Sequence, residues 1–147
     1  MREFKKIVSE EGLMRVREML SGHIPQIKPA YRYYIAVEDG KIKGCVGLKR
    51  QTWYMTEIKH LYVKEEYRNQ GIGNFLVKEV LKRIKAPVVC CTIAGSNDSN
   101  DWSCWIFEGV GFSKRETFVN PDTGHTVSFL TVNMDVVRED QRREVES

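Results

Sequence analysis

Arg68, Gly71 and Gly73 form an R-x-x-G-x-G pattern in the segment Val63–Gly73, which reads VKEEYRNQGIG and could bind a phosphate group. The segment follows a β-like stretch and leads into an amphipathic helix, so free N–H groups of the first helical turn converge on one spot. The two glycines remove side chains where a ligand would approach the backbone. Arg68 adds a positive charge that can pair with a phosphate or order the loop. The pattern therefore predicts a phosphate-binding loop.

Two common phosphate-binding motifs do not fit this loop. A Walker loop requires a lysine after the last glycine, and Asn74 stands there. A dinucleotide fingerprint requires a third glycine, whose place is taken by Leu76, and an acidic residue about 20 positions on. The strand that follows the helix ends at Cys91–Ala94 without a carboxylate. The sequence therefore argues against a nucleotide triphosphate and against a nicotinamide coenzyme.

The pattern resembles the acetyl-CoA loop of the GNAT superfamily of N-acetyltransferases. The loop residues are Arg68-Asn69-Gln70-Gly71-Ile72-Gly73. The preceding HLYVKEEYR is similar to the family's L-x-V-x-x-x-x-R approach. The later NDWSCWIFEGVGF is similar to its second motif, in which an asparagine, here Asn100, opens a helix that ends in Gly-Phe, here Gly111-Phe112. The element order agrees across residues 3–135.

The resemblance implies acetyl-CoA as the cosubstrate and assigns its contacts. The backbone of Leu61, Tyr62 and Val63 would bind the pantetheine arm, and the loop Arg68–Gly73 with Asn74 would hold the pyrophosphate. Asn100 would lie near the pantetheine and the thioester. The implied activity is direct acetyl transfer to an amine, without an acyl-enzyme. The alternative on the same fold is a non-catalytic acyl-CoA sensor or interaction module.

The resemblance also indicates candidate catalytic groups. Glu57 occupies a position like that of the catalytic glutamate in the histone-acetylating branch, and His60 is the next candidate for the general base. A backbone N–H of Leu61 or Tyr62 would stabilise the oxyanion. Many relatives have a tyrosine acid seven residues after the motif asparagine, where Phe107 stands here. Tyr62 or Cys104, one turn before Phe107, could then supply the proton, or the thiolate could leave unassisted.

The acceptor would be a small-molecule or protein amine, with the small molecule slightly favoured. In this architecture it would enter between the loop after the first helix and the final hairpin. The segments concerned are His23–Arg32 with neighbouring Tyr33, Gln51–Met55 and Asn120–His125. Their aromatic side chains could surround an amine, or could simply cover the sheet.

Hydrophobic periodicity predicts the elements that position these residues, and with the resemblance it indicates an α/β fold. We expect a mixed α+β sheet, mostly antiparallel, with a splayed strand pair and helices on both faces. Ile58 and Leu61 are both apolar but three apart, which predicts a β-bulge near Lys59 or His60. Residues 1–136 should form one domain, followed by a charged tail at 137–147. The predicted strands are Phe4–Val8, Tyr33–Glu38, Lys41–Arg50, Thr56–Val63, Val88–Ala94 and the hairpin Lys114–Val119 with Thr126–Asp135; the predicted helices are Ser9–Leu20, Ile72–Ile84 and Trp102–Val110.

Composition narrows the partners and the compartment. A net charge of +3 over 147 residues is too weak and dispersed to indicate nucleic acid. The sequence shows no apolar run of about 18 residues and no charged-then-apolar leader, so it predicts neither a membrane span nor secretion. The four cysteines lack metal-ligand or disulfide-framework spacing, which favours reduced thiols in a cytoplasm and no metal. Exposed strands of the final hairpin are compatible with a homodimer.

Overall fold

The computed structural model describes residues 1–20, 32–94 and 102–146. It contains a seven-stranded sheet with the strand order β1-β2-β3-β4-β5-β7-β6. β4 and β5 pair in parallel, whereas β1 with β2, β2 with β3, β5 with β7 and β6 with β7 pair antiparallel. The predicted mixed, mostly antiparallel sheet is confirmed. The elements are β1 (Arg2–Lys6), α1 (Glu10–Leu20), β2 (Arg32–Glu38), β3 (Lys41–Arg50), β4 (Met55–Val63), the 3-10 helix η1 (Glu65–Tyr67), α2 (Ile72–Leu81), β5 (Val88–Ala94), α3 (Trp102–Val110), β6 (Ser113–Val119), β7 (Thr126–Asn133) and α4 (Met134–Glu146).

The chain forms two compact units. The N-terminal unit comprises Met1–Lys49 and Ile58–Arg83, and the C-terminal unit comprises Arg50–Glu57 and Ile84–Ser147. β4 contributes to both, because its first residues, Met55–Glu57, belong to the C-terminal unit and pair with β5. The rest of the strand belongs to the N-terminal unit, together with the predicted phosphate loop Arg68–Gly73.

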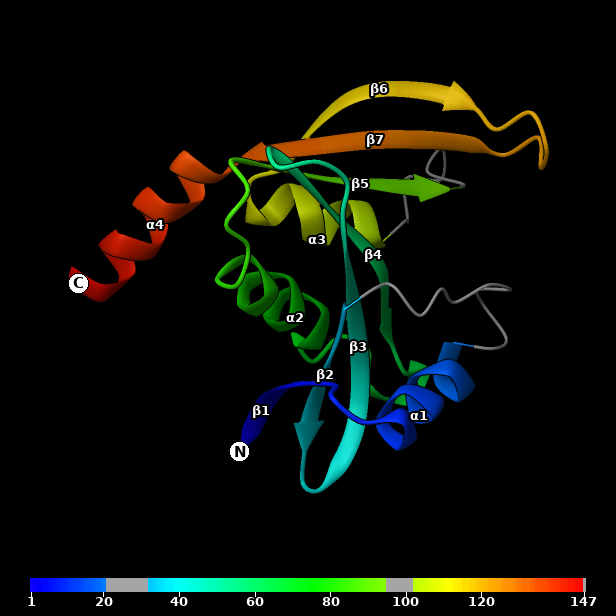
Figure 1. Ribbon diagram of the computed structural model, residues 1–147, viewed down its shortest axis with the longest axis vertical. Coiled ribbons are helices and arrows are strands. Elements are labelled where there is room, and N and C mark those ends of the chain that lie inside the picture. The colour runs from blue at the N-terminus through cyan, green and yellow to red at the C-terminus, as the bar shows by residue number, and fades with distance from the viewer. Residues whose placement is uncertain (21–31, 95–101, 147) are drawn as a thin grey trace. The chain divides into compact units, whose positions relative to one another are not determined.

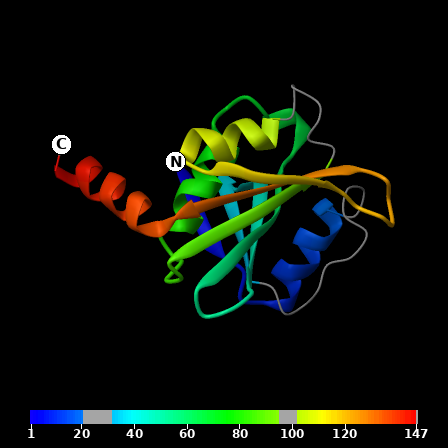
Figure 2. The same ribbon diagram turned by 90° about the horizontal axis from the view of Figure 1, so that it is seen from above.

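In the N-terminal unit, alternate residues of β2 face different helices. Tyr33 is buried in a cluster with Val16 and Leu20 of α1. The next residue, Tyr34, stacks on Phe4 at a centroid distance of 5.0 Å, and Phe4 contacts Phe75 of α2 edge-on. Because side chains alternate along a strand, α1 and α2 cover opposite faces of this part of the sheet, as Figures 1 and 2 show.

The C-terminal unit is built around β5 and β7, which pair along the whole of β5. β7 ends at Asn133, not at Asp135 as predicted, because the Asn133 side-chain oxygen accepts a hydrogen bond from the Asp135 N–H (2.8 Å). This is an N-cap, and α4 begins there and includes most of the expected charged tail. Figure 1 shows α4 continuing from the end of β7.

Local signals in the sequence are confirmed elsewhere. Ser9 caps α1 through a hydrogen bond from the Gly12 N–H to its hydroxyl (3.0 Å). Asp39 and Gly40 both have positive φ (56° and 74°), as a two-residue hairpin turn of this type requires. β1 begins and ends earlier than predicted, because its Arg2–Lys6 register pairs with Tyr34–Glu38 of β2. Within the described residues, no helix is both long and apolar enough to cross a membrane.

Candidate active site

The phosphate loop has a backbone that only a few residue types adopt easily. Asn69 and Gly71 both have positive φ, at 63° and 80°. Gly71 is the N-cap of α2, and the Phe75 N–H donates to its carbonyl oxygen (3.0 Å). The N–H groups of Ile72, Gly73 and Asn74 therefore precede the first intrahelical hydrogen bond and lie at the positive end of the helix dipole. The loop can bind an anion with its backbone.

Arg68 orders this loop through the strand before it. Its Nε donates to the Val63 carbonyl oxygen (3.0 Å), and its guanidinium lies 5.6 Å from the centre of the Tyr62 ring. Of the two roles that the sequence left open for Arg68, this geometry supports ordering the loop. Asn69, Gln70, Gly71 and Asn74 are exposed, whereas Ile72 and Gly73, the first two residues of α2, are buried.

β4 is irregular at His60, as the spacing of its apolar residues predicts. His60 has φ 56°, a left-handed conformation in the middle of a strand. Its Nδ1 and the Tyr33 hydroxyl are 2.7 Å apart and share a hydrogen bond. The Cys45 thiol donates to the His60 carbonyl oxygen (3.6 Å). Burial, and secondarily the charge of Lys59, lower the pKa of His60 below its ordinary value. The half-buried imidazole is therefore biased toward its neutral form.

Glu57 lies on the part of β4 that pairs with β5, opposite Cys90. It is only 8% exposed, and Gln51 Nε2 donates to its Oε1 at 2.5 Å. This contact was not anticipated from the sequence, although Gln51 lies only six residues before Glu57. Gln51 fixes one carboxylate oxygen, and a carboxylate has further lone pairs with which to accept a proton.

Cys104 and Phe107 both lie buried on α3. Phe107 contacts Phe112 edge-on at a centroid distance of 5.1 Å, so it is a core side chain of the C-terminal unit.

Burial is the main cause that raises the pKa of the Cys91 thiol, and charges on Cys90 and Cys104 would raise it further. Asn100, the expected pantetheine contact, lies outside the described residues.

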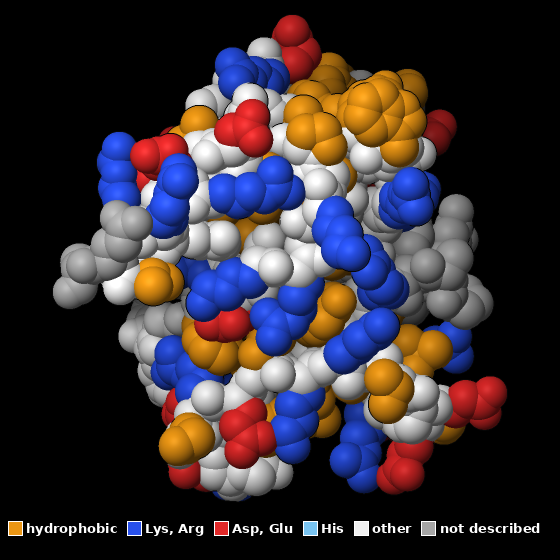
Figure 3. Space-filling model, turned by 60° about the vertical axis from the view of Figure 1, so that its left-hand side comes forward, with side chains coloured by type: hydrophobic (Ala, Val, Ile, Leu, Met, Phe, Trp, Pro, Cys, Tyr) orange, Lys and Arg blue, Asp and Glu red, His pale blue; other side chains and the backbone are white. Residues whose placement is uncertain are grey.

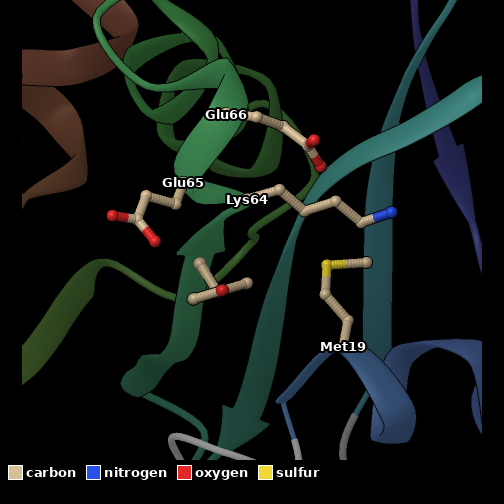
Figure 4. A pocket seen from close by; sticks show the side chains of 5 residues that line it. Met19, Lys64, Glu65 and Glu66 are labelled. Carbon is tan, nitrogen blue, oxygen red and sulfur yellow. The ribbon is translucent and has the colours of Figure 1, made fainter.

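A pocket of about 520 Å³ opens in the N-terminal unit beside Tyr62. Its lining includes Met19 of α1, Lys64, and Glu65 and Glu66 of η1. Figure 4 shows Met19 projecting from α1 toward the Lys64 side chain. The Glu66 carboxylate turns toward Lys64, whereas Glu65 points the other way. The lining combines both charges with apolar surface.

The segments expected to admit the acceptor differ in exposure. Residues 23–31 lie outside the described part of the chain. Tyr33 is 2% exposed and belongs to the core, so it covers the sheet and does not form an open slot. Trp53 and Tyr54 are exposed and meet edge-on at a centroid distance of 5.4 Å. His125 lies exposed in the turn between β6 and β7.

Comparison with known proteins identifies the family. Residues 2–112 match the family described as "Acetyltransferase (GNAT) family". The chain belongs to this family. A curated relative, an uncharacterised N-acetyltransferase of Chlorobaculum tepidum, is 33% identical over 69 residues. That match covers 47% of this chain and 42% of the relative, so the chain spans less than half of that protein's length.

Solved GNAT structures share the fold over almost the whole chain. The ribosomal-protein-S18-alanine N-acetyltransferase of Escherichia coli aligns with a TM-score of 0.74 at 12% identity, covering 91% of this chain and 94% of that one. A GNAT acetyltransferase from Elizabethkingia anophelis, solved with acetyl-CoA bound, aligns with a TM-score of 0.69 at 19% identity, covering 90% and 97%. The resemblance drawn from the loop and its flanks is therefore confirmed.

Proposed function

We propose that this GNAT protein is an N-acetyltransferase that transfers the acetyl group of acetyl-CoA directly to a primary amine. The observation that carries the proposal is the loop in which Asn69 and Gly71, both left-handed, lead into α2, whose first N–H groups precede its first intrahelical hydrogen bond. Family membership and a relative solved with acetyl-CoA support this ligand. The relatives are named as acetyltransferases, which favours catalysis over a purely acyl-CoA-binding module.

Backbone groups and a few side chains would together bind acetyl-CoA. Backbone N–H groups of Gly71–Asn74 would bind the pyrophosphate, with Arg68 holding the loop against β4. Backbone groups of Leu61–Val63 would bind the pantetheine arm. Asn100 and Phe107 are proposed to lie along the same arm.

Acyl-CoA supplies a thioester carbonyl, and the chain's residues would handle the charge and the proton. The acceptor nitrogen attacks the carbonyl carbon, and the C–S bond breaks as the amide forms. The N–H of Leu61 or Tyr62, next to the irregularity at His60, would stabilise the developing oxyanion. Glu57 is proposed as the base that takes the amine proton, with His60 as the second candidate. Cys104 or Tyr62 could protonate the thiolate, or it could leave as the anion.

The acceptor is proposed to be a small-molecule or protein amine, with the small molecule slightly favoured. A panel should contain a peptide with a free N-terminal alanine, spermidine and an aminoglycoside, which represent protein, polyamine and small-molecule amines. Release of free thiol from acetyl-CoA in the presence of each amine would identify the productive class.

The first test is calorimetric titration of acetyl-CoA into the wild type and Gly71→Glu. The glutamate would place a carboxylate at the N-terminus of α2 and require a strained backbone at φ 80°. We expect binding to the wild type and none to the variant, with both proteins folded by circular dichroism. A wild type that does not bind acetyl-CoA would overturn the proposed function.

A further inference from the structure

Arg2, at the start of β1, contacts the phosphate loop although the two are far apart in the sequence. Its guanidinium Nη2 donates to the Gln70 carbonyl oxygen (3.0 Å), although the two residues are 68 positions apart. Its Nε donates to the Glu38 carboxylate (2.8 Å). A Cβ placed on Gly71 would lie 3.7 Å from the Arg2 Nη1. One guanidinium therefore joins the edge of the sheet to the loop.

Arg2 is held in this position by further contacts. Glu38 also accepts a hydrogen bond from Lys43 Nζ (3.1 Å), and Lys43 is 7% exposed and lies 4.6 Å from the centre of the Tyr67 ring. Arg2 itself lies 5.5 Å from the centre of the Phe75 ring in the first turn of α2. Hydrogen bonds from Arg2 and then Lys43 lower the pKa of the Glu38 carboxyl. Because the Glu38 carboxylate holds the Arg2 guanidinium, that group has little freedom to turn away from Gln70.

The contact with Gln70 determines where the next N–H points. In a planar trans peptide, the carbonyl of Gln70 and the N–H of Gly71 point in opposite directions. With the carbonyl directed at Arg2, the Gly71 N–H is directed away from it. If this peptide rotated, the carbonyl oxygen would take the place of the N–H and repel a phosphate. The left-handed Gly71 permits such a rotation more readily than other residue types would.

We propose that Arg2 is a positioning residue for the phosphate loop, and that it keeps the Gly71 N–H directed at the pyrophosphate by binding the Gln70 carbonyl. This inference rests on the proposed acetyl-CoA function. It assigns to the first strand a part in cosubstrate binding that is separate from the R-x-x-G-x-G pattern. Arg2 would act through the backbone and would not contact the phosphates.

The test compares Arg2→Gln, Arg2→Lys and the control Arg83→Gln by calorimetric titration. Arg83 lies 4.4 Å from the centre of the Phe4 ring near the other end of α2, so its loss removes the same charge and a similar ring contact. Lysine and arginine side chains are prominent on the face shown in Figure 3. The control is needed because the loss of any positive charge weakens the field that attracts an anionic ligand. The ligands are CoA and dephospho-CoA, which lacks the phosphate on the ribose.

We expect Arg2→Gln to lower the affinity for CoA and for dephospho-CoA by the same factor, about tenfold, because a charge-assisted hydrogen bond is lost. Arg2→Lys should lose most of this affinity too, because one ammonium cannot reproduce the fork between Glu38 and Gln70. Arg83→Gln should bind like the wild type. In amide NMR spectra, the CoA-induced shift of the Gly71 N–H should be smaller in Arg2→Gln than in the wild type.

Three results would overturn the inference. Affinity loss confined to CoA would mean that Arg2 contacts the ribose phosphate directly. Wild-type affinity in Arg2→Lys would mean that charge alone matters. Unchanged affinity in Arg2→Gln would mean that the contact is only structural. In each case, binding to the wild type that Gly71→Glu abolishes would leave the proposed function standing.

Discussion

Glu57 and His60 lie three residues apart on β4 but have different surroundings. Glu57 is buried and has one oxygen bound by Gln51, which fixes its orientation. His60 is half-buried, bound through Nδ1 to Tyr33, and has a pKa lowered by burial and by Lys59. An imidazole accepts a proton through a ring nitrogen, and a carboxylate accepts one through an oxygen. Substitution is needed to decide which of them is the base.

Replacing Glu57 by Gln keeps the side chain's size and removes the proton acceptor. If Glu57 is the base, kcat/KM for thiol release should fall by about 10²–10⁴ while acetyl-CoA affinity is unchanged. His60→Gln is the matched comparison, because it removes the other candidate on the same strand. A larger loss in His60→Gln would transfer the base role to the histidine. Unchanged rates in both variants would exclude both.

His60 should also make stability depend on pH. Its folded pKa lies below the ordinary value of 6.5, so its contribution to stability is complete above that value and is lost as the pH falls through the folded pKa. Urea unfolding of the wild type and His60→Gln at neutral pH and at about pH 5 tests this. The unfolding free energy of the wild type should fall further than that of the variant. Equal decreases would show that the folded and unfolded pKa values are the same.

At the scale of elements, β3 and β4 approach closely at Gly44. A Cβ at this position would lie 2.7 Å from the Tyr62 carbonyl oxygen and 3.1 Å from Leu76 Cδ1. The first of these is backbone, which cannot move without shifting β4. The absence of a side chain at Gly44 therefore sets the position of the strand that is proposed to bind pantetheine.

Gly44→Ala should displace the Tyr62–Val63 peptide and pack the core too tightly. We expect a loss of about 1–3 kcal/mol in unfolding free energy, together with weaker acetyl-CoA binding. Gly109→Ala is the control, since Gly109 is an exposed residue of α3 where a Cβ meets nothing within 4 Å, and alanine should stabilise the helix by up to about 1 kcal/mol. Urea unfolding and calorimetry measure both effects. Gly44→Ala with wild-type stability would show that β4 adjusts without cost.

The sequence predicts features whose signals are local. The Ser9 cap, the Asp39-Gly40 turn and the phosphate loop each depend on a few consecutive residues, and the Asn133 cap could have been found in the same way from the Asp135 that follows. The contact of Tyr33 with His60 spans 27 positions, and that of Arg2 with Gln70 spans 68. Such contacts depend on strand register and on how α2 packs, which periodicity does not specify.

At the scale of the whole molecule, β4 links the two units covalently within one strand. Its residues before Ile58 pair with β5, and the proposed pyrophosphate loop follows its other end. A strand whose two parts belong to different units favours their unfolding together, because melting either part removes pairing partners from the strand. We therefore expect one cooperative transition for the described elements.

Hydrogen exchange with mass spectrometry tests this in peptides from β2 and β5, which report on different units. Acetyl-CoA at about 100 times its Kd should raise the free energy of global opening by about 2.7 kcal/mol. Because the proposed loop lies in the N-terminal unit, the same increase in β5 peptides would mean that the units open together. An increase confined to β2 peptides would mean that they open separately. In Gly71→Glu, acetyl-CoA should not raise the free energy of opening in either peptide, which would show that the increase depends on binding at the loop.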